Sequence, residues 1–177
     1  EKLALKGSGE TQHRHAEYFL RVAEAMKTKS GAEIFKHLET DLGNFHHAYS
    51  WLLEREETRH RALALFCHLS KLFMSYGYVR EGREWVKAAL AFPSDVSWQW
   101  ADALHVAGSL ARIQGELSQA RELYAQSREL WRRLGDQDNE VRVLGNLAII
   151  YTEEGQYALA GESYEFVLAH FKKAGNT

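Results

Sequence analysis

Residues 104–124 read LHVAGSLARIQGELSQARELY, and residues 144–164 read LGNLAIIYTEEGQYALAGESY. The two segments are 40 positions apart (144 − 104), and small or apolar residues recur at seven aligned positions. These are Leu104, Ala107, Gly108, Ala111, Gly115, Ala120 and Tyr124 in the first segment, and Leu144, Leu147, Ala148, Tyr151, Gly155, Ala160 and Tyr164 in the second. Similarity at a fixed offset of this size is typical of stacked repeats. The sequence therefore predicts a scaffold of repeated units.

The rest of the chain also has apolar residues at helical spacing, three or four residues apart. We expect helices over 11–27, 30–56, 58–76, 79–92, 97–114, 118–134, 138–154 and 156–173, with a capping box of Ser30 and Glu33 at the start of the second. The predicted fold is all-α, a right-handed superhelix of about four helical hairpins. The predicted organisation is a linker or frayed end over 1–10, a divergent capping hairpin over 11–57, and repeats over 58–177 (58–92, 97–134 and 138–173).

Composition narrows the class of protein. With 45% hydrophobic and 26% charged residues, the sequence resembles neither a disordered tail nor a membrane protein. The formal charge of −2 provides no basic patch, so we expect no nucleic-acid binding by this segment. The single cysteine, Cys67, excludes an intramolecular disulfide and fits a reducing compartment, so we expect a cytoplasmic protein. The chain opens on Glu1, has no signal peptide, and is expected to be part of a longer protein.

The repeat resembles the tetratricopeptide repeat. The pattern LxxLAxxYxxxGxYxxAxxxY over 144–164 is similar to that family, LxxAGxxAxxxGxLxxAxxxY over 104–124 is nearly as similar, and FxxLSxxFxxxGxVxxGxxxV over 66–86 is a degenerate third copy. In this interpretation the small residues let paired helices approach closely, and the glycines permit the tight reversals between them. The resemblance implies a non-catalytic scaffold that binds partners.

A second resemblance concerns the context of the repeats. A period near 40 is longer than the usual 34, and such arrays resemble the C-terminal arrays of bacterial STAND-class transcriptional regulators, which carry an ATPase of the NB-ARC type. The passages RHAEYFL (14–20), LExDxxNFxxAxxW (38–51) and YVxEGRxW (78–85) resemble the same family. The resemblance implies an ATPase before residue 1. No phosphate loop of the form GxxxxGK[ST] occurs in this chain, so nucleotide binding is not expected here.

The sequence gives little support for a catalytic or metal-binding site. His13 and His15 lie two positions apart, and His46 and His47 are adjacent, so each pair points to different faces of a helix. Cys67 has no base beside it apart from His68, which faces elsewhere. We therefore predict no enzyme activity, no metal site and no cofactor. For Trp51, Trp85 and Trp131 helical spacing favours packing between repeats, and Trp98 and Trp100 are the pair that could form a contact surface.

The expected functional surface is the concave groove that the first helix of each repeat lines. The resemblance assigns to it Lys71, Met74, His105, Ser109, Arg112, Arg142, Ile149 and Thr152. Its basic side chains could hold an acidic or phosphorylated segment, or could simply keep the groove hydrated. The preferred function is a protein-interaction and sensor module of a larger signalling ATPase or transcriptional regulator, whose partner could be its own ATPase. The alternatives are a small-ligand sensor, which a pocket lined by apolar and aromatic groups between the first hairpin and the repeats would favour, and a structural self-association unit.

Overall fold

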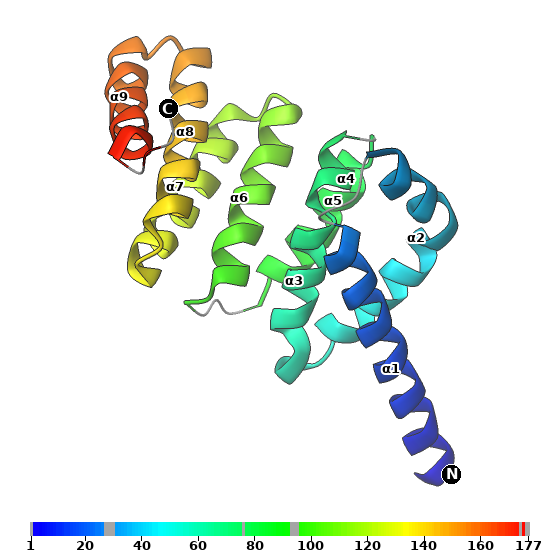
Figure 1. The fold of residues 1–177 in the computed structure, drawn as a ribbon. Helices are drawn as coiled ribbons and strands as arrows, with labels where there is room; N and C mark the ends of the chain where they lie inside the picture. Colours follow the sequence, from blue (N-terminus) through cyan, green and yellow to red (C-terminus); the bar gives the residue numbers. More distant parts are fainter. Residues whose placement is uncertain (1, 27–30, 76, 93–95, 174, 176–177) are drawn as a thin grey trace. The chain divides into compact units, whose positions relative to one another are not determined.

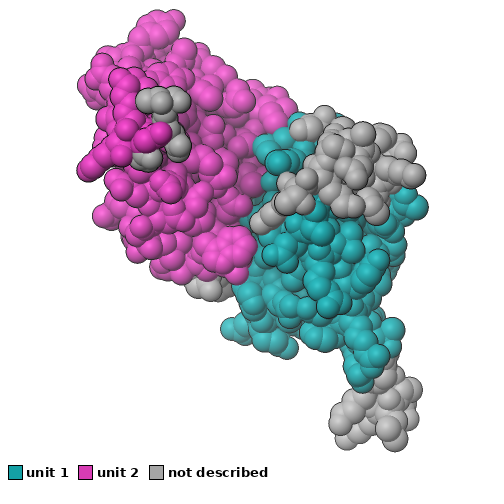
Figure 2. All heavy atoms as spheres, in the orientation of Figure 1, with its two compact units in different colours: residues 1–92 teal, residues 93–177 magenta. Residues whose placement is uncertain are grey.

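The computed structural model describes every residue except 1, 27–30, 76, 93–95, 174 and 176–177, and omits the side chains of 2–8, 31–39 and 75. Over the described residues, all regular structure is helical, which confirms the predicted all-α class. The chain forms two compact units, residues 1–92 and 93–177, coloured separately in Figure 2. The right-handed superhelix predicted for the whole chain spans both units and stays a prediction.

The first unit contains α1 (Lys2–Met26), α2 (Gly31–Leu53), a 3-10 turn (Glu56–Thr58), α3 (Arg59–His68), α4 (Ser70–Ser75) and α5 (Val79–Leu90) (Figure 1). Both α1 and α2 pack against α3, so the hairpin predicted as a cap over 11–57 shares its compact unit with the next helices. Helix α1 begins at Lys2, although the sequence predicted a linker or frayed end over 1–10. Residues 2–6 read KLALK, all strong helix formers, and the following glycines lower helix propensity without ending the helix. The predicted capping box falls on Ser30, which is outside the described residues.

The helix predicted over 58–76 is divided at Leu69. The Leu69 amide donates to both Leu65 O (3.2 Å) and Phe66 O (3.1 Å), so the helix tightens for one turn between α3 and α4. The surrounding core is aromatic. Phe66 stacks on Phe73 with centroids 5.5 Å apart, and Phe73 meets Trp85 of α5 at 5.4 Å.

The second unit consists of α6 (Trp98–Ile113), α7 (Leu117–Leu134), α8 (Gln137–Glu153) and α9 (Tyr157–Lys173), close to the predicted helices. Neighbouring helices pack in sequence order, α6 on α7, α7 on α8 and α8 on α9. Gly115 and Gly155, 40 positions apart, both have positive φ (80° and 75°). Matching bonds close the two turns, from Glu116 N to Ala111 O (3.0 Å) and from Gln156 N to Tyr151 O (2.7 Å). The two hairpins are thus built in the same way.

The core of this unit lies between successive helices. A cluster of buried residues joins α6, α7 and α8: Ala101, Ala111, Ala120, Tyr124, Trp131, Val143, Leu147 and Ile150. The Ser127 hydroxyl of α7 is fully buried and donates to Ala101 O of α6 at 2.6 Å. The predicted packing role of Trp131 is confirmed, since this side chain is buried in the cluster.

Candidate partner-binding surfaces

The structure divides the eight predicted groove residues between the two units. Lys71 and Met74 lie on α4 of the first unit, exposed and half-buried respectively. The others lie on the first helices of the two hairpins of the second unit: His105, Ser109 and Arg112 on α6, and Arg142, Ile149 and Thr152 on α8. These six therefore share the second unit, and Lys71 and Met74 share the first.

Helices α6 and α8 are joined by a row of polar side-chain bonds, which we call the α6–α8 ladder. Arg142 donates to Asp102 Oδ1 at 2.8 Å, and Arg112 donates to Glu153 Oε1 at 3.0 Å. Between these ion pairs, Asn146 Nδ2 lies 2.6 Å from His105 Nε2. The ladder therefore links equivalent faces of consecutive repeats.

Sequence reasoning missed three members of the ladder, Asp102, Asn146 and Glu153. The signal for them was the repeat itself, because bonded residues stand 40 or 41 positions apart (142 − 102, 146 − 105 and 153 − 112). Residues at equivalent positions of stacked hairpins lie on the same face one repeat further along. Searching that offset for opposite charges would have found both ion pairs.

His105 is the buried centre of the ladder. Burial, and then the nearby Arg142 charge, lower its pKa to about 4, although Asp102 acts in the opposite direction. Its imidazole is therefore neutral at neutral pH. Its Nδ1 is buried without a hydrogen-bond partner and lies 3.9 Å from Asp102 Oδ1.

The remaining α6 and α8 residues contact their own helices or the core. Ser109 accepts a hydrogen bond from the Tyr124 hydroxyl at 3.0 Å and donates to His105 O. Thr152 is exposed and donates to Ala148 O, and Ile149 is half-buried. Arg112 and Arg142 each have a carboxylate partner, so this face carries ion pairs; the two roles that the sequence left open for its basic side chains, holding an acidic segment or keeping the groove hydrated, both stay predictions. Such a face suits a polar peptide with both donors and acceptors, and an anionic ligand would have to share these arginines.

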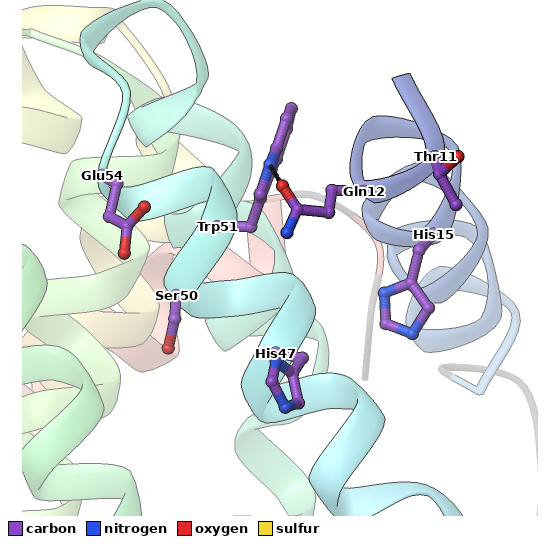
Figure 3. A pocket seen from close by; sticks show the side chains of 7 residues that line it. All are labelled: Thr11, Gln12, His15, His47, Ser50, Trp51 and Glu54. Carbon is purple, nitrogen blue, oxygen red and sulfur yellow. Dashed lines mark hydrogen bonds between the residues drawn. The ribbon is translucent and has the colours of Figure 1, made fainter. Parts of the chain in front are cut away.

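A cleft of about 370 Å³ lies between α1 and α2 in the first unit (Figure 3). Its lining residues are Thr11, Gln12, His15, His47, Ser50, Trp51 and Glu54. The Trp51 indole donates to Gln12 Oε1 at 3.1 Å, and the Arg55 guanidinium lies 4.1 Å from the Trp51 ring centre. Trp51 therefore ties α2 to α1.

Within the described residues, no group of three His, Cys, Asp or Glu side chains is placed to hold a metal ion.

A second cleft, of about 280 Å³, lies between α2 and α5, and its walls combine aromatic, aliphatic and acidic side chains. Tyr49 stacks on Trp85 with ring centroids 4.4 Å apart, and Phe92 and His46 line the same space. Burial raises the Tyr49 pKa well above its usual range, so this hydroxyl stays protonated. Glu54 and Glu84 stand at the cleft. This cleft between the first hairpin and the degenerate repeat is thus lined by both aromatic and polar side chains.

The two remaining tryptophans, Trp98 and Trp100, differ in their exposure to solvent. Trp98 is 43% exposed, whereas Trp100 is buried, so the structure does not support a contact surface made by both indoles. The reason is their spacing, since residues two apart on α6 point about 200° from each other around the helix.

Among the described residues, no helix is long and apolar enough to span a bilayer.

Comparison with known protein families gives one match, in the second unit. Residues 101–173, which run from α6 to α9, match the family model described as tetratricopeptide repeat, which supports a tetratricopeptide-repeat array in this segment. No curated protein matches the chain. Tetratricopeptide repeats generally mediate protein–protein interactions and are typically non-catalytic. The degenerate copy predicted over 66–86 lies outside the matched residues.

Proposed function

We propose that this chain is the non-catalytic interaction and sensor module of a cytoplasmic STAND-type regulator or signalling ATPase, and that it binds its protein partner on the α6–α8 face. The observation that carries this proposal is the α6–α8 ladder. Asp102–Arg142, His105–Asn146 and Arg112–Glu153 hold polar groups from two repeats in a fixed row. Fixing side chains before binding lowers the entropy that binding must overcome. The family resemblance supplies the regulator context, and the preferred partner is the ATPase of the parent protein.

Calorimetric titration of this chain with the ATPase portion of its parent protein tests the proposal. We expect binding that Arg142→Glu weakens about tenfold or more, because the change removes a donor and places two carboxylates together. Arg133→Glu is the matched control, since Arg133 is an exposed arginine on α7 whose partner is Glu129 of its own helix. Equal binding by the two variants would place the partner elsewhere. If the gene of the parent protein encodes no ATPase, the proposal that this chain belongs to a STAND-type regulator or signalling ATPase is rejected.

The α2–α5 cleft favours a second candidate function, sensing of a small ligand. Its volume of about 280 Å³ is at the small end of ligand pockets, and its aromatic walls suit a ligand with an apolar face. Trp85 provides the readout, because a ligand against Tyr49 and Trp85 would change the indole fluorescence. Candidate sugars and amines would be titrated against the wild-type chain. Ala88→Trp, which fills the cleft, should abolish the response, and Ala125→Trp, at an exposed position of α7, should not.

A further inference from the structure

The α2–α5 cleft is lined by two carboxylates, Glu54 directly after α2 and Glu84 on α5, and its described lining contains no lysine or arginine. Glu84 is exposed and has no ion-pair partner within the described part of the chain. Glu54 is 73% exposed, and its Oε2 lies 3.7 Å from Arg55 Nη1, beyond hydrogen-bond distance. The Arg55 guanidinium lies instead over the Trp51 ring. Both carboxylates can therefore accept hydrogen bonds from a ligand.

The inner part of the cleft is apolar. Tyr49 and Trp85 stack on each other and are each 3% exposed, and Leu53 and Phe92 are half-buried. The Tyr49 hydroxyl is already used, since it donates to the Trp85 carbonyl. A cavity of about 150 Å³ can hold benzene, so a cleft of about 280 Å³ has room for one ring with a short chain.

The wall of the cleft already holds a cation that belongs to the chain. The Arg59 guanidinium lies 3.7 Å from the centre of the Phe92 ring, and Arg59 Nε donates to Leu53 O at 3.3 Å. Positive groups are attracted to the faces of aromatic rings. Arg59 is not among the lining residues, so it does not fill the cleft. The contact shows that this wall accommodates a positive group.

These groups select among the classes of small ligand. An anion would meet two carboxylates with no lysine or arginine in the lining to offset them. An ammonium group has only N–H donors, which the carboxylates and the Ser50 hydroxyl can accept. We infer that the α2–α5 cleft binds the ammonium form of a small amine whose apolar body packs against Leu53 and Phe92. This inference rests on the second proposed function, that the cleft senses a small ligand.

Calorimetric titration of the whole chain with three probes of similar shape tests this inference. The probes are 2-phenylethylamine, which is protonated at neutral pH, 2-phenylethanol, which is neutral, and phenylacetate, which is an anion. We expect the amine to bind about tenfold more tightly than the alcohol, because hydrogen bonds between charged groups are stronger than neutral ones. Phenylacetate should not bind. The preference for the amine should decrease as salt is raised, since both carboxylates are exposed.

A charge-removing variant locates the ammonium group. Glu84→Gln keeps the shape of the side chain, and it should lower the affinity for the amine about threefold or more, as expected at an exposed carboxylate. The affinity for the alcohol should not change. Glu24→Gln is the matched control, since Glu24 is an exposed glutamate of α1 that does not line the cleft. Both positions are exposed, so both variants should keep the wild-type circular dichroism spectrum.

The possible failures of the amine inference and of the small-ligand function can be told apart. Equal affinity for the amine and the alcohol, with both lost in Ala88→Trp, would overturn the inference and leave the cleft as a small-ligand site. Tighter binding of phenylacetate, again lost in Ala88→Trp, would do the same. An amine affinity that Glu84→Gln and Glu24→Gln lower equally would place the ammonium group elsewhere and also overturn it. If no probe binds at millimolar concentration, both the inference and the small-ligand function are rejected.

Discussion

A Cβ atom added to Gly108 would lie 2.8 Å from two ring atoms of Tyr124, closer than side chains tolerate. The tyrosine has little room to move away, because its ring is 1% exposed and its hydroxyl donates to Ser109 Oγ at 3.0 Å. The contact between α6 and α7 therefore depends on the absence of a side chain at position 108.

Replacing this glycine should destabilise the second unit. We expect Gly108→Ala to lower the free energy of unfolding by about 1–3 kcal/mol, the usual cost of overpacking. Gly145→Ala is the matched control, since its added Cβ would meet nothing within 4 Å, and this change should be neutral or stabilise by about 0.5–1 kcal/mol. Urea denaturation followed by circular dichroism measures both. If the two substitutions changed the free energy of unfolding equally, the Tyr124 ring would have moved away from the added Cβ atom without cost.

The buried histidine should make stability depend on pH. The pKa of His105 is about 4 in the folded chain and about 6.5 in the unfolded chain, so the unfolded state takes up a proton first. The contribution of the neutral imidazole is then complete above about pH 6.5 and is lost as pH falls toward 4. It amounts to about 3 kcal/mol at 1.36 kcal/mol per pKa unit. His105→Gln should flatten this part of the urea-derived stability profile, and an unchanged profile would contradict the assignment to His105.

The Asp102–Arg142 pair should contribute modestly to stability. Both side chains are partly exposed, at 21% and 46%, so solvent screens their attraction. A double-mutant cycle with Asp102→Ala and Arg142→Ala should give a coupling energy of about 0.2–1 kcal/mol. The coupling should shrink as salt is raised. A coupling of zero at low salt would mean that this bond of the ladder does not form in solution.

The buried hydroxyl of Ser127 should stabilise the first hairpin of the array. Ser127→Ala removes the 2.6 Å bond to Ala101 O, and we expect a loss of about 1 kcal/mol in the free energy of unfolding. Ser118→Ala, at an exposed position of the same helix, is the control and should change stability by less than about 0.5 kcal/mol. Thermal denaturation of the two variants gives the comparison, and a neutral Ser127→Ala would imply that the carbonyl finds another donor.

Much of the second unit could be predicted from the sequence. The 40-residue offset located the helices of both hairpins to within one or two residues, and Gly115 and Gly155 marked the turns. The reason is that these features are local, since a left-handed turn requires glycine and an amphipathic helix requires its periodicity. The first unit was harder. The tightening at Leu69 depends on hydrogen bonding that no spacing rule records, and at Lys2 the helix-forming residues 2–6 outweigh the glycines that favoured a linker.

For the candidate binding surfaces, too, the sequence determined one part and the tertiary structure another. The sequence alone determined that α6 and α8 repeat each other and therefore present equivalent faces. Only the tertiary structure decided that Arg142 and Arg112 of those faces are neutralised by Asp102 and Glu153, and that Tyr164 is exposed where Tyr124 is buried. The physical reason is that the charge balance and exposure of a side chain depend on its neighbours in space. Those neighbours come from other helices, 40 or 41 positions away for the two ion pairs and 19 to 26 positions away for the α8 residues that cover Tyr124.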